Sequence, residues 1–241
     1  MGKNKVIAII PARWASTRLP GKPLADINGK SMIQLVYEAV EKSEVDKVVV
    51  ATDNELIFEA VKDFGGDVVM TSPKHQTGTD RILEAYENYK EDYEYVVNVQ
   101  GDEPMINPDD VNRLVNNLKK EKYKIATLVG YLEGDQRTDR NTVKAFADNG
   151  EIVMFTRSPL YGNALFFFRH IGVYGFSKVI AKKIDKNVMI ETTNEIVESL
   201  EQIRWADNGI KFTYAITHGR YKGIDTEKDL DHYRSYLNKT R

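Results

Sequence analysis

Short apolar runs alternate with stretches of helical period along the first half of the chain. The apolar runs, each predicting a buried strand, are Val6–Ile10, Val48–Ala51, Val68–Met70, Tyr95–Val99 and Ile125–Leu128. The stretches between them predict helices over Met32–Val40, Leu56–Phe64, Asp80–Tyr89 and Asp109–Lys119. The runs are apolar throughout, as expected when helices cover both faces of a parallel sheet. The pattern therefore predicts an α/β fold with an open, mostly parallel, twisted sheet.

The rhythm changes after Val143. Two short strands, Val143–Ala147 and Ile152–Thr156, flank an Asn149-Gly150 pair that suits a tight hairpin turn. The elements expected after them are a strand over Phe166–Phe176, helices over Lys178–Ile184 and Glu195–Asp207, a strand over Phe212–Ile216 and a helix over Glu227–Leu237. We therefore expect one domain over residues 1–241, with a small antiparallel insertion for dimerisation or substrate around 142–176. The run Phe166–Phe168 is expected to be buried, in the core or in a subunit interface.

Composition removes several classes of function. The 34 basic and 36 acidic side chains among 241 residues leave a formal net charge of -2, so the overall positive field of a nonspecific nucleic-acid binder is missing. There is no cysteine, which excludes disulfides, thiolate nucleophiles and Cys-ligated metals. No run of about 18 apolar residues suggests a membrane span. These features favour a cytoplasmic protein without nucleic-acid or membrane partners.

The loop after the first strand carries several cations. Residues 11–24 read PARWASTRLPGKPL, with Arg13, Arg18 and Lys22, no acidic residue and the single glycine Gly21. The loop matches neither GxGxxG nor the Walker A pattern. Cations spaced in this way suit a polyphosphate held by side-chain charge. A basic, solvated loop would have the same composition, so the loop alone leaves both interpretations open.

Seven segments, in order over nearly the whole chain, resemble those of the 3-deoxy-manno-octulosonate cytidylyltransferases, or CMP-Kdo synthetases. They are PARWASTRLPGKPL at 11–24, VATD at 50–53, HQTGTDR at 75–81, NVQGDEPMI at 98–106, RHIGVYGF at 169–176, ESLEQIR at 198–204 and GIDTEKDL at 223–230. The resemblance implies a fold of the nucleotide-diphospho-sugar transferase type. It also implies an enzyme that joins CTP and 3-deoxy-manno-octulosonate (Kdo) to give CMP-Kdo and pyrophosphate for lipopolysaccharide biosynthesis, with Mg²⁺ and usually as a homodimer.

Other functions stay open at this point. The eleven residues between Ser158 and His170 form a shorter segment than the family usually has, which leaves 8-amino-Kdo or another sugar acid as alternative substrates. A metal-dependent glycosyltransferase and a nucleotide-binding module without chemistry are more distant alternatives. The basic loop at 11–24 argues against the former, and the joint presence of Asp102 and Asp225 argues against the latter.

Two carboxylates are candidate magnesium ligands. Asp102 follows the strand ending at Val99, next to Gly101, which permits close approach of a ligand to the backbone. Magnesium prefers oxygen ligands, and one or two carboxylates plus phosphate oxygens make a sufficient site. Asp225 is the second candidate, and by resemblance the two are the metal-binding pair of the family.

Neighbouring acidic residues have ordinary alternative explanations. Asp225 could cap the last helix, but Thr226 and Asp229 already resemble a capping box. Glu103 is expected to be a surface or orienting carboxylate. Asp102 and Asp225 therefore remain the pair expected to act in catalysis.

The remaining site residues are assigned by the resemblance. Arg13 and Lys22 are expected to stabilise charge that develops as the α-phosphorus is displaced. Residues expected to bind CTP are Ala12, Arg13, Arg18, Lys22, Gln76, Thr77, Gly78 and Asp102. Thr79 is expected to cap a helix that starts at Asp80.

A sugar acid requires a cation for its carboxylate and both donors and acceptors for its hydroxyls. Residues expected to supply them are Gln100, Arg157, His170, Tyr174, Glu198 and Gln202, with Arg157 as the carboxylate partner. Glu198 and Gln202 are four residues apart and are expected to share one helix face. His170 is expected to contact the sugar, with a general base or a structural histidine as alternatives.

Overall fold

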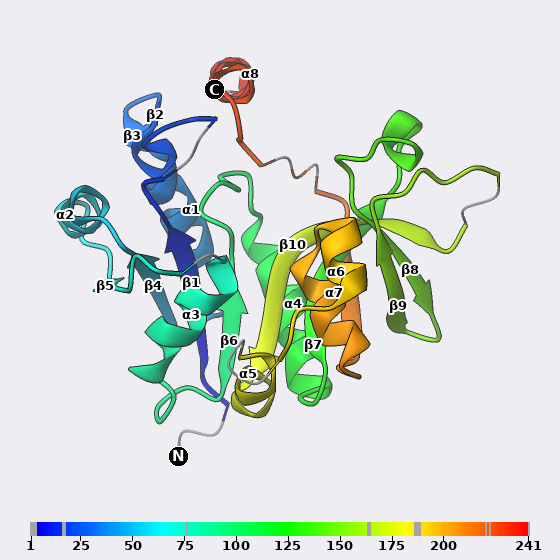
Figure 1. The fold of residues 1–241 in the computed structure, drawn as a ribbon. Coiled ribbons are helices and arrows are strands. Elements are labelled where there is room, and N and C mark those ends of the chain that lie inside the picture. Colours follow the sequence, from blue (N-terminus) through cyan, green and yellow to red (C-terminus); the bar gives the residue numbers. More distant parts are fainter. Residues whose placement is uncertain are drawn as a thin grey trace.

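A nine-stranded mixed sheet runs through the protein in the order β5-β4-β1-β6-β10-β7-β11-β9-β8 (Figure 1). The computed structural model describes residues 4–15, 18–75, 77–162, 165–185, 189–219, 221 and 223–240. The strands of the sheet are β1 (Val6–Ala12), β4 (Lys47–Thr52), β5 (Val68–Met70), β6 (Tyr95–Asn98), β7 (Ile125–Tyr131), β8 (Lys144–Asp148), β9 (Glu151–Thr156), β10 (Phe167–Ser177) and β11 (Phe212–Thr217). A separate two-stranded hairpin pairs β2 (Asp26–Ile27) with β3 (Lys30–Ser31).

The first strands form the parallel part of the sheet. β1 pairs in parallel with β4 and β6, and β4 with β5, while β7 pairs in parallel with β11. β10 lies antiparallel between β6 and β7 and joins the two parallel groups. The predicted α/β fold with a mostly parallel sheet and an antiparallel addition is confirmed.

Helices cover both faces of this sheet. They are α1 (Met32–Glu41), α2 (Glu55–Asp63), α3 (Gly78–Glu87), α4 (Pro108–Lys120), α5 (Lys178–Ile184), α6 (Thr193–Glu198), α7 (Glu201–Asp207) and α8 (Glu227–Thr240), with short 3-10 turns at Lys22–Leu24 and Gly134–Arg137. Alternate residues of β1 face opposite sides: Ala8 packs in the core with α1, α2 and α4, and Ile9 packs in the core with α3, α5 and α7. Within the described residues, no helix is both long and apolar enough to cross a lipid bilayer.

The β8–β9 hairpin lies at one edge of the sheet. Asn149 and Gly150 both have positive φ, 49° and 79°, as the tight turn predicted there requires. β8 also pairs with the start of β10, so three antiparallel strands form this edge. Phe166 is 64% exposed on the single chain beside the hairpin, so it does not lie in the core, and its burial in a subunit interface stays a prediction.

The helix predicted over Glu195–Asp207 is two helices. α6 ends at Ser199, whose φ of 53° is left-handed, and Leu200 is extended before α7 begins. A left-handed residue breaks the helical path, so residues on either side of it do not keep helical spacing. Glu198 and Gln202 therefore do not share a helix face, contrary to expectation.

Candidate active site

The loop after β1 turns sharply at Gly21 and brings Lys22 to the edge of the sheet. Gly21 has a φ of +66°, and a Cβ there would lie 3.2 Å from the Trp14 ring. Both the positive φ and the close ring favour glycine at this position. Lys22 then opens a 3-10 turn with Pro23 in its first turn.

Lys22 lies between the two carboxylates that the sequence singles out. Its Nζ donates to Oδ2 of Asp102 at 2.6 Å and to Oδ1 of Asp225 at 3.1 Å. The backbone joins the same segments, because the Ile224 amide donates to the Asp102 carbonyl at 3.0 Å. Arg18 adds a second cation, 3.1 Å from Oδ2 of Asp225. Burial lowers the pKa of Lys22, but the charges and hydrogen bonds of both carboxylates outweigh it, so the pKa is raised.

The geometry fits the expected magnesium. The Lys22 ammonium is a stand-in cation, since one oxygen from each of Asp102 and Asp225 converges on it. Both oxygens are hard carboxylate ligands of the kind Mg²⁺ prefers. No group of three or more His, Cys, Asp or Glu side chains suited to a metal occurs among the residues described. Oxygens of a bound triphosphate would therefore have to complete the coordination.

The capping residues leave Asp225 available for this role. Thr226 and Asp229 form the expected reciprocal cap of α8: the Asp229 amide donates to Thr226 Oγ1 at 3.2 Å, and the Thr226 amide donates to Asp229 Oδ2 at 3.1 Å. Asp225 points instead at Lys22 and Arg18. The expectation that Thr226 and Asp229, rather than Asp225, cap the last helix is confirmed.

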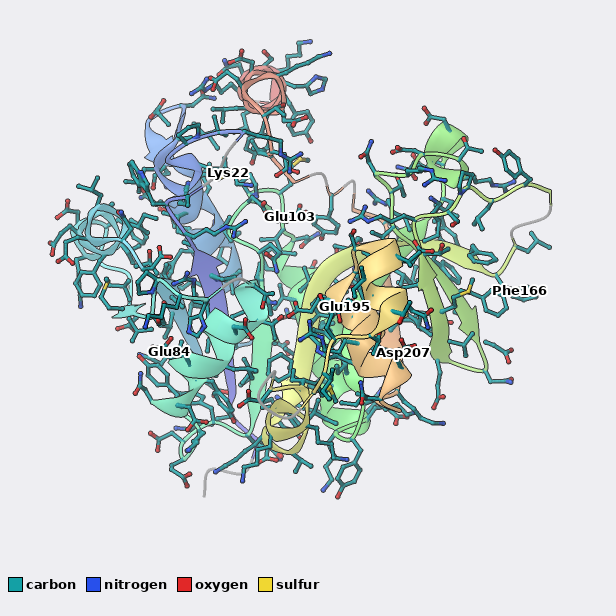
Figure 2. The ribbon with its side chains drawn as sticks, viewed as in Figure 1. Lys22, Glu84, Glu103, Phe166, Glu195 and Asp207 are labelled. Atoms are coloured by element: carbon teal, nitrogen blue, oxygen red, sulfur yellow. The ribbon has the colours of Figure 1, made fainter. Side chains whose placement is uncertain are left out.

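Glu103 has a buried carboxyl oxygen beside this cluster, so of the two expected roles, surface or orienting carboxylate, the surface position is wrong. Burial, together with the Asp102 charge, raises its pKa to about 8. Its Oε2 and the Nε of Arg169 are both buried and have no hydrogen-bond partner among the described residues. Figure 2 shows Glu103 and Lys22 toward the same end of the sheet. Glu103 and Arg169 also line the larger cavity described below.

A cavity of about 400 Å³ lies between the basic loop and the start of α3. Its lining includes every described residue expected to bind CTP, namely Ala12, Arg13, Arg18, Lys22, Thr77, Gly78 and Asp102. Gln76 lies outside the described residues. Gln100, expected on the sugar side, also lines this cavity.

The helix that borders this cavity starts earlier than expected. Thr77, rather than Thr79, caps α3 by accepting from the Asp80 amide at 3.2 Å. Thr79 is buried and donates to Oε2 of Glu201 at 2.8 Å. The amide end of α3, with its partial positive charge, therefore faces the cavity at Gly78.

A larger cavity of about 1270 Å³ adjoins the first. Arg157 and His170 line it, together with Glu103, Arg169 and the segment 139–143. The two cavities share Arg18, Asp102 and Asp225. The candidate metal ligands therefore lie where the two cavities meet.

Besides Gln100, three more of the expected sugar residues do not line the larger cavity. Tyr174 is buried, with its ring centroid 5.4 Å from those of both His170 and Trp205. Gln202 is also buried, in α7. Glu198 accepts from the Arg157 amide at 2.7 Å and from Thr156 Oγ1 at 2.8 Å. These residues support the cavity wall from behind.

His170 is a poor general base. Burial and the Arg157 charge lower its pKa to about 3, so the ring is neutral at physiological pH. Its Nε2 lies 3.0 Å from Thr127 Oγ1, which itself donates to the Val173 carbonyl at 2.8 Å. Nε2 therefore carries the proton, and Nδ1 is the acceptor. The ring contributes a hydrogen bond and shape to the cavity rather than proton transfer.

This depressed pKa predicts an acid-sensitive fold. Between about pH 3 and pH 6.5 the folded protein binds fewer protons at His170 than the unfolded chain does. Stability should fall as the pH drops, by up to about 2 kcal/mol at pH 5 relative to pH 8. Urea unfolding at both pH values should show this loss in the wild type and its disappearance in His170→Gln. The variant His232→Gln, at an exposed histidine, serves as control. If His170→Gln lost as much stability at pH 5 as the wild type, the depressed pKa could not be assigned to His170.

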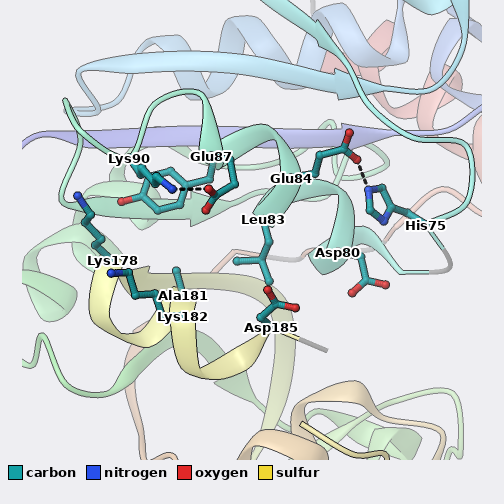
Figure 3. Close-up of a pocket in the computed structure, with 11 residues that line it drawn as sticks. His75, Asp80, Leu83, Glu84, Glu87, Lys90, Lys178, Ala181, Lys182 and Asp185 are labelled. Carbon is teal, nitrogen blue, oxygen red and sulfur yellow. Dashed lines mark hydrogen bonds and ion pairs between the residues drawn. The ribbon is translucent and has the colours of Figure 1, made fainter. Parts of the chain in front are cut away.

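A third cavity, of about 280 Å³, lies between α3 and α5 (Figure 3). Charged side chains line much of it. Lys90 pairs with Glu87, and His75 pairs with Glu84. Of the described residues that line the cavity of about 400 Å³, which we call the smaller of the two candidate substrate cavities, only His75 also lines this third one. None of the described residues expected to bind substrate lines it, and we assign it no substrate.

Comparison with known proteins adds independent information. The cytidylyltransferase family model matches residues 7–214. A 3-deoxy-manno-octulosonate cytidylyltransferase of Parabacteroides distasonis is 43% identical over 249 aligned positions, covering 97% of this chain and 98% of the relative. The enzyme of the same description from Fusobacterium nucleatum is 40% identical, with 97% of each chain covered.

Solved structures agree with these relatives. A CMP:2-keto-3-deoxy-manno-octonic acid synthetase complexed with CTP superposes with a TM-score of 0.92 at 33% identity, covering 98% of this chain and 100% of that one. A putative glucose-1-phosphate thymidylyltransferase from Bacillus anthracis has a TM-score of 0.69 at 16% identity, covering 96% of this chain and 94% of that one. The latter likeness concerns the fold alone, which is of the nucleotide-diphospho-sugar transferase type.

Proposed function

Because the chain belongs to the 3-deoxy-manno-octulosonate cytidylyltransferases, we propose that its two cavities hold the two substrates of that reaction, CTP in the smaller and Kdo in the larger. The protein is a nucleotidyltransferase that joins CTP and Kdo to give CMP-Kdo and pyrophosphate. The observation that carries the proposal is the junction of the cavities at Arg18, Asp102 and Asp225. Reacting groups of two substrates have to come within about 3.5 Å of each other, and this junction is where both cavities allow it.

The reaction is a displacement at the α-phosphorus of CTP. The anomeric hydroxyl oxygen of Kdo forms a new bond to this phosphorus, the bond from phosphorus to the bridging oxygen breaks, and pyrophosphate leaves with the electron pair. The hydroxyl proton is released, and no protein base is assigned to it. Catalysis then depends mainly on positioning and on neutralising phosphate charge.

Asp102 and Asp225 would hold Mg²⁺ at this junction. When bound, the ion supplies charge neutralisation for the triphosphate and lowers the pKa of the attacking hydroxyl. The convergence of one oxygen from each carboxylate on the Lys22 ammonium supports this assignment. Lys22 would donate to a phosphate oxygen once the nucleotide is bound, and Arg13 and Arg18 would stabilise charge on the leaving pyrophosphate.

Pyrophosphate release from CTP tests the proposal directly. With Mg²⁺ present, release should require Kdo and should be matched by an equal amount of CMP-Kdo. CTP alone should give none. Release that is independent of the sugar acid, or no release with Kdo, would refute the proposed reaction.

The exposed apolar side chains beside the β8–β9 hairpin support a homodimer. Val153, Met154, Leu165 and Phe166 are all exposed on the single chain, Leu165 at 73%. Figure 2 shows Phe166 at the outer edge of the molecule, away from Lys22 and Glu103. We propose that a second copy covers this patch, since exposed apolar groups of this kind mark interaction surfaces.

Light scattering at micromolar concentration is expected to give twice the 27.5 kDa mass of one chain. Phe166→Asp should shift the protein toward monomer, because it places a charge within the buried contact. Tyr123→Asp, an equally exposed aromatic on the turn before β7, should leave the mass unchanged. A monomeric wild type would contradict the dimer.

A further inference from the structure

Lys144 is a charged side chain with no exposed surface. It begins β8 and pairs across the sheet with Thr156 on β9 and Arg169 on β10. Burial lowers the pKa of Lys144, and the nearby Asp139 charge opposes this effect. A buried ammonium group is costly unless its donors are satisfied.

Backbone carbonyls satisfy this ammonium group. Nζ donates to the carbonyls of Asp139 at 2.7 Å, Thr142 at 2.9 Å and Arg157 at 3.0 Å. An ammonium group has three donors, so all of them are used. Lys144 thereby ties the segment 139–142 to the residue that follows β9.

Arg157 reinforces the same connection from its side chain. Its Nη1 donates to the carbonyls of Arg140 and Asn141, both at 3.3 Å. Asp139 shapes the segment locally, because its carboxylate accepts from the Asn141 amide at 2.9 Å and from Thr142 Oγ1 at 3.0 Å. The carbonyls of segment 139–142 therefore point at the Lys144 ammonium and the Arg157 guanidinium.

The elements joined in this way line the larger cavity, whereas Lys144 does not. Residues 139–142 and Arg157 all form part of its wall. Building on the proposed function, we propose that Lys144 is a positioning residue for the sugar acid. It fixes the segment 139–142 against Arg157 and so gives the sugar side of the active site its shape, without contacting either substrate.

Kinetics of Lys144→Met test this role. Methionine keeps the length and removes the charge and all three donors. The KM for Kdo should rise about tenfold or more, because the wall loses three hydrogen bonds to a charged group. The KM for CTP should stay within about twofold of the wild type, since no residue of the smaller cavity is touched. Equal changes in both KM values, or an unchanged KM for Kdo, would overturn the proposal.

Two further variants separate positioning from simple destabilisation. Lys144→Arg keeps a cation but not three donors from one atom, so its KM for Kdo should lie between those of wild type and Lys144→Met. Should Lys144→Met not fold, Lys144→Arg decides alone, and a KM for Kdo equal to the wild-type value refutes the role. Ile152→Ala, a buried change on β9, should lower Tm without moving the KM for Kdo.

A double-mutant cycle tests whether Lys144 acts through Arg157. In an Arg157→Ala background, Lys144→Met should raise the KM for Kdo by a smaller factor than in the wild type, because the guanidinium that donates to the carbonyls of Arg140 and Asn141 is already absent. If the double variant raised the KM for Kdo by the product of the two single-variant factors, Lys144 would not act through Arg157. CMP-Kdo formation by the wild type tests the proposed function separately, so an active wild type with unchanged Lys144 variants refutes only this inference.

Discussion

Replacing Asp102 or Asp225 by asparagine is expected to lower kcat about 10²- to 10³-fold or more while the fold survives. Asparagine keeps the shape of the side chain but removes the negative charge that would hold Mg²⁺. The triphosphate would then be poorly neutralised in the transition state. The fold should persist because the two side chains are 28% and 43% exposed, and partly exposed ion pairs contribute little to stability.

Pyrophosphate release at saturating CTP and Kdo, with Mg²⁺ titrated, measures this effect. Asp231→Asn is the matched control, since Asp231 is an exposed carboxylate on α8 that pairs only with surface Arg234 among the contacts described. Circular dichroism and thermal unfolding should show that each variant is folded. Near-normal turnover in a folded Asp102→Asn or Asp225→Asn protein would remove that residue from the metal site.

Kdo is expected to be activated with a kcat/KM up to about 10⁴- to 10⁵-fold larger than that of a nine-carbon sialic acid. Discrimination of this size arises where a wrong substrate leaves buried polar groups unpaired. Glu103, Arg157 and Arg169 line the larger cavity, so a sugar that fits it places its polar groups against these charged side chains. CTP should likewise be preferred over UTP.

Parallel kcat/KM measurements on Kdo, 8-amino-Kdo and sialic acid with CTP test this preference. Plain Kdo is the expected substrate, and better use of the 8-amino sugar would overturn only that narrower choice. Equal or better use of sialic acid would overturn the proposed fit of the cavity to Kdo. Glu103→Gln offers an internal comparison, because it keeps the shape of a side chain that lines the larger cavity and changes its hydrogen bonding.

Features that depend on residues close together in the sequence were predictable. The apolar runs gave the strands and their parallel packing, and the Asn149-Gly150 pair gave the hairpin. The Thr226–Asp229 pair indicated the cap of α8 and so left Asp225 for the site. Each of these depends on residues close together in the chain, where propensity and spacing carry the information.

Features that depend on tertiary context were missed. Ser199 adopts a left-handed conformation for which serine gives no strong signal, so one helix was expected where there are two. Glu103 was expected to be a surface or orienting carboxylate, and the burial of its Oε2 was missed because burial is set by segments far away in the chain. Lys144 did carry a signal, as a single charge within an apolar strand, but its carbonyl partners could not be read from the sequence.

The position of β10 also matters while the chain is being synthesised. β6 and β7 are both complete by residue 131, yet the strand that lies between them does not begin until residue 167. Until then β6 has an unpaired inner edge and β7 has two unpaired edges, because its other neighbour, β11, begins only at residue 212. Residues such as Val97 and Leu128, fully buried in the finished protein, lie along those edges. We therefore expect the emerging chain to be prone to aggregation until β10 and β11 have left the ribosome.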